Sequence, residues 1–431
     1  MNPGSAPGRV HAGEWPAVAV SFVYFFCVLA AYYMIRPVRE QLSAAVGSTQ
    51  LPWFYSATLV AMLALAPVFG ALVSKYPRRI VVPLINLVFI ACLLGFVPLF
   101  SQPDLLSPRT LGVLFFVWVS VFNLFVVSVF WIFMTDIWSV PQSRRLFPVI
   151  ALSGTIGAVT GPALTRGLVG AIGVAPLLLV SASLLTVALG CVVWLGRWAR
   201  LHGARRAPAD EAAVGGGMFD GLRQVLSDPF MRSMALLLLL ADGIGTVNYA
   251  LVTDYSNAAF TDAVARTRFA ANVDLATNVL TAVVQLTLTR WLLPRAGAGP
   301  TILLWAGGSL AMLLLVVFAA DPYAPIVAGM PAVALALIVS RGLAYGMAEP
   351  ARHSLFAGVP RNLRYKGQNA VDTAVWRFGD VVIAVGMNAL RGIGASVGVF
   401  AALSAAAAVG AGAVGWATAR RVERRDPPPA S

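Results

Sequence analysis

Long apolar runs, separated by short polar segments, repeat along the whole chain. A membrane-spanning helix needs about 20 mostly apolar residues. Runs of that kind cover residues 16–35, 54–73, 80–100, 110–134, 146–165, 175–196, 231–253, 270–289, 301–320, 325–347, 370–390 and 394–418. The pattern predicts an all-α integral membrane protein with twelve transmembrane helices.

The longest polar interruption covers residues 197–230 and divides the predicted helices into two groups of six. Two six-helix bundles around a midplane site are the outline of the major facilitator fold. The predicted organisation is a tail over 1–15, an N-terminal bundle over 16–196, a linker over 197–230, a C-terminal bundle over 231–418 and a tail over 419–431.

Composition and charge agree with this interpretation and add an orientation. Of the 431 residues, 59% are hydrophobic and 11% are charged, whereas soluble domains have about 25% charged residues. The net charge of +13 favours contact with anionic membrane lipids over nucleic acid. Placing the N-terminus inside puts about three times as many Lys and Arg on the inner side as on the outer side. We therefore expect a bacterial inner-membrane protein with both termini in the cytoplasm.

Enzyme motifs are missing from the sequence. Neither lysine, Lys75 or Lys366, stands in a phosphate-binding loop, and there is no His-Glu-x-x-His or Gly-x-Ser-x-Gly sequence. The three cysteines fall inside apolar runs without metal-ligand spacing. We expect a protein that is not an enzyme, has no cofactor or metal, and needs no obligate protein partner.

The segment between the second and third runs, GALVSKYPRR, is basic. It resembles the loop 2–3 signature of the major facilitator superfamily, Gly-x-x-x-Asp-Arg-x-Gly-Arg-Arg. Ser74 replaces the acid and Pro77 the second glycine. The residues that fit are Gly70, Lys75, Arg78 and Arg79. The alternative is a basic inner loop with no further role.

The fifth run contains GTIGAVTGP, in which Gly157 and Gly161 are four residues apart and Pro162 follows. Small residues at this spacing let two helix backbones approach closely. The element is similar to the Gly-x-x-x-Gly-Pro sequence of facilitator antiporters, which implies exchange. Helix packing alone is the other interpretation.

Charged residues lie deep inside several predicted spans. The charges are Asp242, Asp274, Arg341, Arg377 and Asp380. Each costs roughly 2.5–3.5 kcal/mol on insertion scales, and together they cost on the order of 15 kcal/mol. Such charges must face a wet cavity or pair with one another, for example Arg341 or Arg377 with Asp380. The candidates for proton coupling or gating are Glu40, Asp136, Asp242, Asp274, Glu349, Asp372 and Asp380.

The first apolar run ends in MIRPVRE, on the side predicted to face outward, where positive charge is unusual. Arg36 and Arg39 are three residues apart and can share a helix face with Tyr32. Guanidinium groups match carboxylate or phosphate groups bidentately, so the pair is expected to bind an anion. Pro37 is expected to bend the segment. The remaining predicted substrate-binding residues are Asn123, Arg341 and Arg377.

Two stretches resemble a narrower family. Ile35–Glu40 is similar to the Leu-Arg-x-x-Lys-Asp segment that ends helix one in the ATP/ADP translocase family of plastids and intracellular bacteria. The second stretch comprises Glu349, Pro350, Arg352, Lys366, Gly367, Asp372, Arg377, Gly379 and Asp380. The chain most resembles the short bacterial members, which implies exchange of a nucleotide or another organic anion.

The sequence therefore predicts a secondary active transporter that works by alternating access, moving an organic anion by exchange or proton coupling. One alternative is a proton-coupled exporter of amphiphilic drugs or metabolites, which the GTIGAVTGP sequence favours and the arginine pair disfavours. A second alternative is a membrane scaffold or lipid-handling protein without solute flux.

Overall fold

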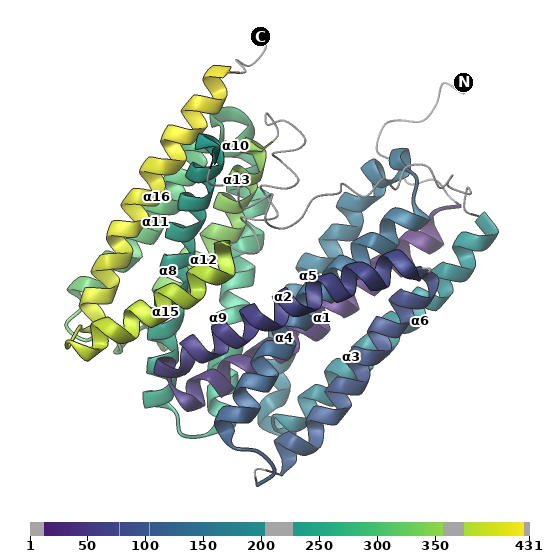
Figure 1. Ribbon diagram of the computed structural model, residues 1–431, viewed down its shortest axis with the longest axis horizontal. Helices are drawn as coiled ribbons and strands as arrows, with labels where there is room; N and C mark the ends of the chain where they lie inside the picture. The colour runs from purple at the N-terminus through teal and green to yellow at the C-terminus, as the bar shows by residue number, and fades with distance from the viewer. Residues whose placement is uncertain (1–12, 77, 103, 203–226, 357–374, 426–431) are drawn as a thin grey trace. The chain divides into compact units, whose positions relative to one another are not determined.

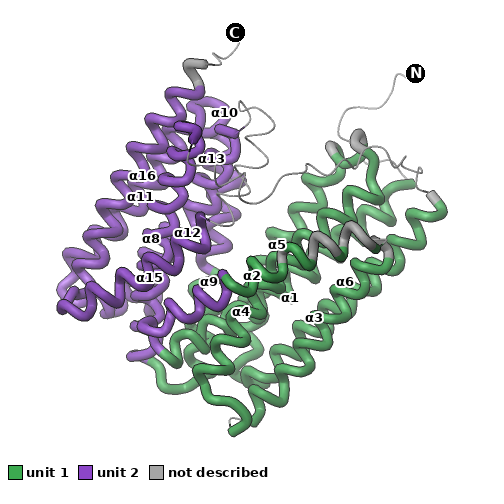
Figure 2. Tube along the Cα trace, in the orientation of Figure 1, with its two compact units in different colours: residues 1–46, 60–210, 260–275 green, residues 47–59, 211–259, 276–431 purple. Residues whose placement is uncertain are grey.

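The computed structural model describes residues 13–76, 78–102, 104–202, 227–356 and 375–425. Helices account for nearly all of the described secondary structure (Figure 1). The chain divides into two compact units, which Figure 2 distinguishes by colour. Unit 1 comprises residues 1–46, 60–210 and 260–275, and unit 2 comprises residues 47–59, 211–259 and 276–431. Residues 47–59, predicted for the N-terminal bundle, thus belong to unit 2, and residues 260–275, predicted for the C-terminal bundle, belong to unit 1.

Unit 1 is built from long helices. They are α1 (Trp15–Val46), α3 (Arg78–Ser101), α4 (Pro108–Ile137), α5 (Val140–Ile172) and α6 (Ala175–His202), with the later part of α2 (Leu51–Lys75) and the first part of α9 (Ala263–Val284). Local signals fix where some of these helices begin. The Ser107 hydroxyl accepts a hydrogen bond from the backbone N–H of Thr110 at the start of α4, and the Gln142 side chain accepts one from the N–H of Ser139 before α5.

Unit 2 combines long helices with several short elements. They are η1 (Ser48–Gln50), α8 (Pro229–Ala259), η3 (Gln285–Thr289), α10 (Arg290–Ala296), α11 (Ala298–Phe318), α12 (Ala332–Leu343), η4 (Ala344–Ala348), α13 (Glu349–Leu355), α15 (Trp376–Gly392) and α16 (Val397–Arg425). Both η3 and η4 are π-helical turns, which are rare and often occur at functional sites.

Helix α1 is longer than predicted. The apolar run ends at Ile35, but the helix continues to Val46 with Pro37 inside it. The residues expected to leave the helix at its end therefore lie in its interior. Arg36, Pro37 and Val38 are all buried.

The predicted span 325–347 is helical only from Ala332 onward, so its first part is wrong. Residues Pro325–Val327 and Met330–Pro331 form a two-stranded antiparallel hairpin. Ala328 and Gly329 both have positive φ angles, 51° and 78°, as a tight two-residue hairpin turn requires. Proline at each strand excludes these residues from the interior of a helix.

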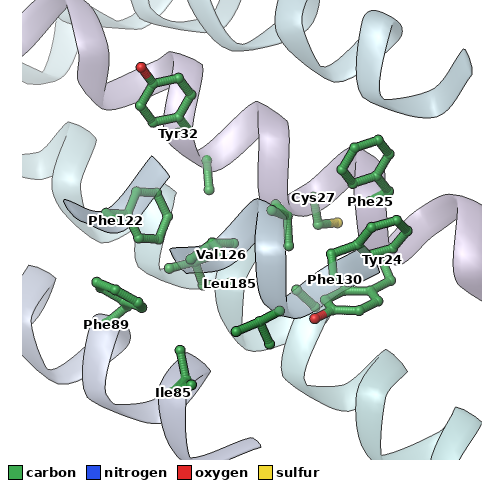
Figure 3. Close-up of a cluster of buried hydrophobic side chains, with 14 of the residues drawn as sticks. Tyr24, Phe25, Cys27, Tyr32, Ile85, Phe89, Phe122, Val126, Phe130 and Leu185 are labelled. Atoms are coloured by element: carbon green, nitrogen blue, oxygen red, sulfur yellow. The ribbon is translucent and has the colours of Figure 1, made fainter. Parts of the chain in front are cut away.

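The core of unit 1 is rich in aromatic side chains that join α1, α3, α4 and α6 (Figure 3). Phe25 of α1 stacks on Phe130 of α4, with ring centroids 4.1 Å apart. Trp118 and Phe122 stack along α4 at 5.4 Å. Offset and edge contacts of this kind add to the free energy gained by burying the rings. The core holds α1 in a fixed position beside α4.

Many large apolar side chains are exposed along the helices of both units, including Leu84, Leu87 and Leu94 on α3 and Leu303 and Leu304 on α11. Apolar surface of this extent marks a membrane-facing protein. Among the described residues, 10 helices are long and apolar enough to cross a membrane, judged by length and composition. The prediction of a helical multi-pass membrane protein is confirmed at this level.

Candidate functional site

Unit 1 holds a buried group of charges around Arg36. The Arg36 Nη1 atom lies 3.6 Å from Asp274 Oδ1 of α9, and its Nε atom lies 3.6 Å from Glu40 Oε1 one turn along α1. Arg36 is 6% exposed and Asp274 is 2% exposed. The sequence predicted each of these residues as a candidate but not that they meet.

Aromatic rings surround the same arginines. The Arg36 guanidinium lies 5.7 Å from the ring centroid of Tyr33, and the Arg39 guanidinium lies 4.6 Å from that of Phe116 on α4. Tyr32 is buried, with its ring 4.9 Å from that of Tyr33. Cations over ring faces gain up to about 2 kcal/mol when desolvated. These rings fix where the guanidinium groups point.

The Arg36 ion pairs are long. Charge-assisted hydrogen bonds between guanidinium and carboxylate have N···O distances of about 2.7–2.9 Å, whereas both Arg36 distances are 3.6 Å. Arg36 Nε is buried and has no hydrogen-bond acceptor among the described residues. The Arg39 Nη2 atom, by contrast, lies 2.5 Å from Glu40 Oε1. Arg36 therefore keeps hydrogen-bonding capacity for another oxygen ligand.

Unit 2 has a second group of charges, on α8 and α15, in which Asp380 is buried and Asp242 and Arg377 are half-buried. Arg377 Nη1 lies 3.2 Å from Asp380 Oδ2, and the Thr246 hydroxyl donates to Asp380 Oδ1 at 3.1 Å. Asp242 lies beside this pair, because a Cβ added at Gly379 would be 3.1 Å from Asp242 Oδ2. This acidic cluster of Asp242, Arg377 and Asp380 contains two carboxylates and one guanidinium. It could hold a proton between its two acids.

Two predicted substrate-binding residues lie outside these groups. Arg341 on α12 is half-buried, and its guanidinium lies 5.9 Å from the ring centroid of Tyr249. Asn123 is half-buried on α4.

The other gating candidates differ in setting. Glu349, at the start of α13, lies 2.8 Å from Arg352 and 3.2 Å from His353. Asp136 is exposed near the end of α4. Asp372 lies outside the described residues.

The basic motif of residues 70–79 is described only in part. Gly70 and Lys75 lie in the last turns of α2 (ending at Lys75), and Arg78 and Arg79 open α3, so the predicted loop residues stand in the ends of these two helices. The side chains of Lys75, Arg78 and Arg79 are not among those that the structure describes.

The glycines of α5 lie where its backbone meets that of α1. A Cβ added at Gly157 would lie 2.7 Å from the carbonyl oxygen of Phe26, and one at Gly161 would lie 2.7 Å from that of Ala30. One turn further on, the Thr165 hydroxyl donates to the carbonyl of Met34 at 2.7 Å. Pro162 lies inside α5 between these contacts. This packing positions the part of α1 that precedes Arg36.

Sequence reasoning missed two polar contacts. Arg391 Nη2 lies 2.6 Å from Asp254 Oδ2 in unit 2. In unit 1, Arg145 Nη2 lies 3.0 Å from Glu14 Oε1. All four residues stand next to the ends of predicted spans, and this position was the one signal that could have marked them as candidates. Their pairing could not be predicted, because the partners are far apart in the sequence.

Comparison with known proteins shows the fold. No family model matches the chain, and no curated protein sequence matches it either. A crystal structure of a variant of the nucleoside transporter NupG has a TM-score of 0.65 and 13% identity, covering 94% of this chain and 99% of that one. The POT family transporter PepTSo has a TM-score of 0.63 and 11% identity, covering 98% and 100%. A bacterial homologue of the iron transporter ferroportin, in an inward-facing state, has a TM-score of 0.62 and 14% identity, covering 95% and 100%.

The chain is thus an α-helical, multi-pass membrane protein. Its fold is that of major facilitator superfamily transporters such as FucP, which matches with a TM-score of 0.56 over 94% of this chain at 14% identity. The sequence prediction of this fold is confirmed, and the narrower resemblance to ATP/ADP translocases stays a prediction.

Proposed function

We propose that the protein is a secondary active transporter that moves a small organic anion, with nucleotides as the first class to test. The observation that carries the proposal is the buried guanidinium of Arg36 in α1, whose Nε atom has no hydrogen-bond acceptor among the described residues. A buried donor left unsatisfied costs about 1–3 kcal/mol. An anionic oxygen of a substrate would satisfy it and would bind in the bidentate geometry that guanidinium favours.

The acidic cluster of unit 2 supports coupling to protons. It has one more carboxylate than guanidinium, and Asp380 is buried. Two neighbouring carboxylates in a low-dielectric setting do not both remain ionised easily. Binding a proton on one side of the membrane and releasing it on the other, at Asp242 and Asp380, would couple transport to the proton gradient, which supplies the driving force.

The membrane arrangement belongs to the same proposal. Ten of the predicted spans contain helices that are long and apolar enough to cross a membrane. The other two predicted spans, 54–73 and 370–390, contain helices α2 and α15, which supports a total of twelve spans. The excess of arginine in the inner segments supports cytoplasmic termini in a bacterial inner membrane. The glycine contacts between α5 and α1 are compatible with exchange.

Flux into proteoliposomes tests the function. Purified protein should take up labelled ADP, ATP or a dicarboxylate when the vesicles contain unlabelled counter-substrate or when a pH gradient is imposed. Arg36→Gln should abolish both modes, whereas Asp242→Asn should abolish the response to the pH gradient and keep exchange. Arg200→Gln, at an exposed position near the end of α6, is the matched control and should transport normally.

Wild-type protein that moves no nucleotide, phosphate or dicarboxylate would contradict the anion proposal. Uptake of amphiphilic drugs that depends on Asp242 but not on Arg36 would favour the exporter alternative. Movement of lipid with no solute flux would favour the lipid-handling alternative.

A further inference from the structure

The sequence Trp-x-x-x-Arg occurs at two helix ends in unit 2. Trp291 and Arg295 lie on the short helix α10, and Trp416 and Arg420 lie near the end of α16. Residues four apart share a helix face. In both pairs the guanidinium lies over the indole ring, 5.4 Å from the centroid in α10 and 4.4 Å in α16. The two helix ends carry the same arrangement independently.

The two pairs belong to one end of unit 2. Helix α10 leads through Gly297 directly into α11. A Cβ added at Gly299, in the first turn of α11, would lie 2.9 Å from Cε3 of Trp416. Arg295 is four residues from Gly299, so its Cα lies at most about 14 Å from that of Gly299 even if the chain between them is fully extended. The α10 pair is therefore close to Trp416. Figure 1 shows α10 and the C-terminal end of α16 at the same end of the unit.

The surface around these pairs is strongly basic. Arg290 and Arg421 adjoin the pairs and are exposed, as are Arg295 and Arg420. The sequences of α10 and α11 contain no acidic residue, and α16 contains only Glu423. This arginine–tryptophan surface, made by Arg290, Trp291, Arg295, Trp416, Arg420 and Arg421, is therefore complementary to an anion.

The ring contacts leave N–H donors of each guanidinium available. A ring contact occupies the planar face of the group, whereas its N–H donors point outward from the edge. In α10 the Arg295 Nη1 atom also donates to the carbonyl of Trp291 at 3.2 Å, which fixes the side chain further. Edge donors held in this way match phosphate oxygens.

The neighbouring surface decides which phosphate compound fits. Leu303 and Leu304, one turn beyond Gly299 on α11, are exposed, and so is Val409, two turns before Trp416 on α16. An inorganic phosphate would leave this apolar surface uncovered, whereas the acyl chains of a lipid would lie along it. Tryptophan is also enriched where membrane helices meet the headgroup layer.

We propose that the arginine–tryptophan surface is a binding site for an anionic phospholipid of the phosphatidylglycerol type. Its phosphate lies between the Arg295 and Arg420 side chains, and its acyl chains lie along α11 and α16. The site shares no residue with the Arg36 group or with the acidic cluster, and it does not depend on the proposed transport function.

Native mass spectrometry of the detergent-purified protein tests the site. Added phosphatidylglycerol should bind with a preference over phosphatidylcholine of the same acyl chains. The double variant Arg295→Gln/Arg420→Gln should bind phosphatidylglycerol about thirtyfold more weakly, given the contribution of each arginine near an anionic lipid. Trp291→Leu/Trp416→Leu should weaken binding while the net charge stays the same.

The control variant is Arg200→Gln, which removes an exposed arginine from a helix end of unit 1; it should bind phosphatidylglycerol as the wild type does. Equal binding of the two lipids by wild-type protein would overturn the proposal. So would unchanged binding by the double arginine variant, or an equal loss in the control. Competition by inorganic phosphate at the same concentration as the lipid would show a free-anion site and would also overturn it.

Discussion

The Nη1 atom of Arg36 and the Oδ1 atom of Asp274 lie 3.6 Å apart, with both side chains buried. Removing one partner of a buried ion pair leaves an uncompensated charge and typically costs about 3–5 kcal/mol. We therefore expect Asp274→Asn to lower the free energy of unfolding by roughly that amount, measured by denaturation in detergent. Arg36→Met should also destabilise the protein, and the double variant Arg36→Met/Asp274→Asn should lose clearly less than the sum of the two single losses. If the two single changes add without coupling in this cycle, the contact contributes nothing.

Gly161 is predicted to tolerate no side chain. A Cβ at this position would lie 2.7 Å from the carbonyl oxygen of Ala30, and overpacking of this kind costs about 1–3 kcal/mol. Gly161→Ala should therefore lower the thermal stability. Gly167→Ala in the same helix is the matched control, since no atom lies within 4 Å of its Cβ position. It should leave stability unchanged or raise it by about 0.5–1 kcal/mol, as expected for alanine in a helix.

The two π-helical turns of unit 2 are joined by a hydrogen bond. The Thr289 hydroxyl of η3 donates to the carbonyl of Gly346 in η4 at 2.6 Å. Thr289→Val keeps the side-chain shape and leaves that buried carbonyl without this donor, so unfolding should become easier by about 1–3 kcal/mol. Thr287→Val is the control, because the exposed Thr287 hydroxyl donates to the carbonyl of Val283, one turn earlier in α9, and does not join the two π-helical turns. Equal effects of the two changes would show that the link between the turns is unimportant.

Tyr323, in the segment between α11 and α12, should make stability depend on alkaline pH. Burial raises the pKa of its phenol from 10.0 to about 12, with a further increase from the Asp254 carboxylate and an opposing effect of Arg391. In the unfolded chain the phenol loses its proton near pH 10, but in the folded chain it does so only near pH 12. The stabilising contribution is therefore complete below pH 10 and is lost as the pH rises to about 12.

The measurement is the free energy of unfolding across this range for wild type and Tyr323→Phe. The wild-type value should fall relative to the variant between pH 10 and about pH 12. Parallel curves for the two proteins would contradict the assignment.

Hydropathy was sufficient to predict most of the helix positions, because a membrane helix must be both long and apolar. It failed before Ala332, where an apolar stretch with two prolines forms a hairpin. It also failed at Ile35, where the sequence becomes charged but the helix continues to Val46. The charges of Arg36 and Arg39 are tolerated there because Asp274 and Glu40 lie beside them. Asp274 is distant in sequence, and no local pattern reveals a partner brought close by the tertiary fold.

The charge group of unit 2 shows the same limit. Arg377 and Asp380 are three residues apart on one helix, so their ion pair was among the interpretations that the sequence allowed. Arg341 was an equal candidate for pairing with Asp380, but the structure places its guanidinium over Tyr249. The choice between the two arginines depends on how α8, α12 and α15 pack, which periodicity does not specify.

The acidic cluster of unit 2 has an electrical consequence. Moving one elementary charge across a membrane potential of 100 mV changes its energy by about 2.3 kcal/mol. Asp242, Arg377 and Asp380 carry one net negative charge when all are ionised and none once a proton is bound. A conformational step that moves the cluster through part of the membrane's electric field would therefore depend on voltage when the cluster is fully ionised. The same step would not depend on voltage once the cluster has bound a proton. Transport currents recorded at different holding potentials would distinguish these two states directly.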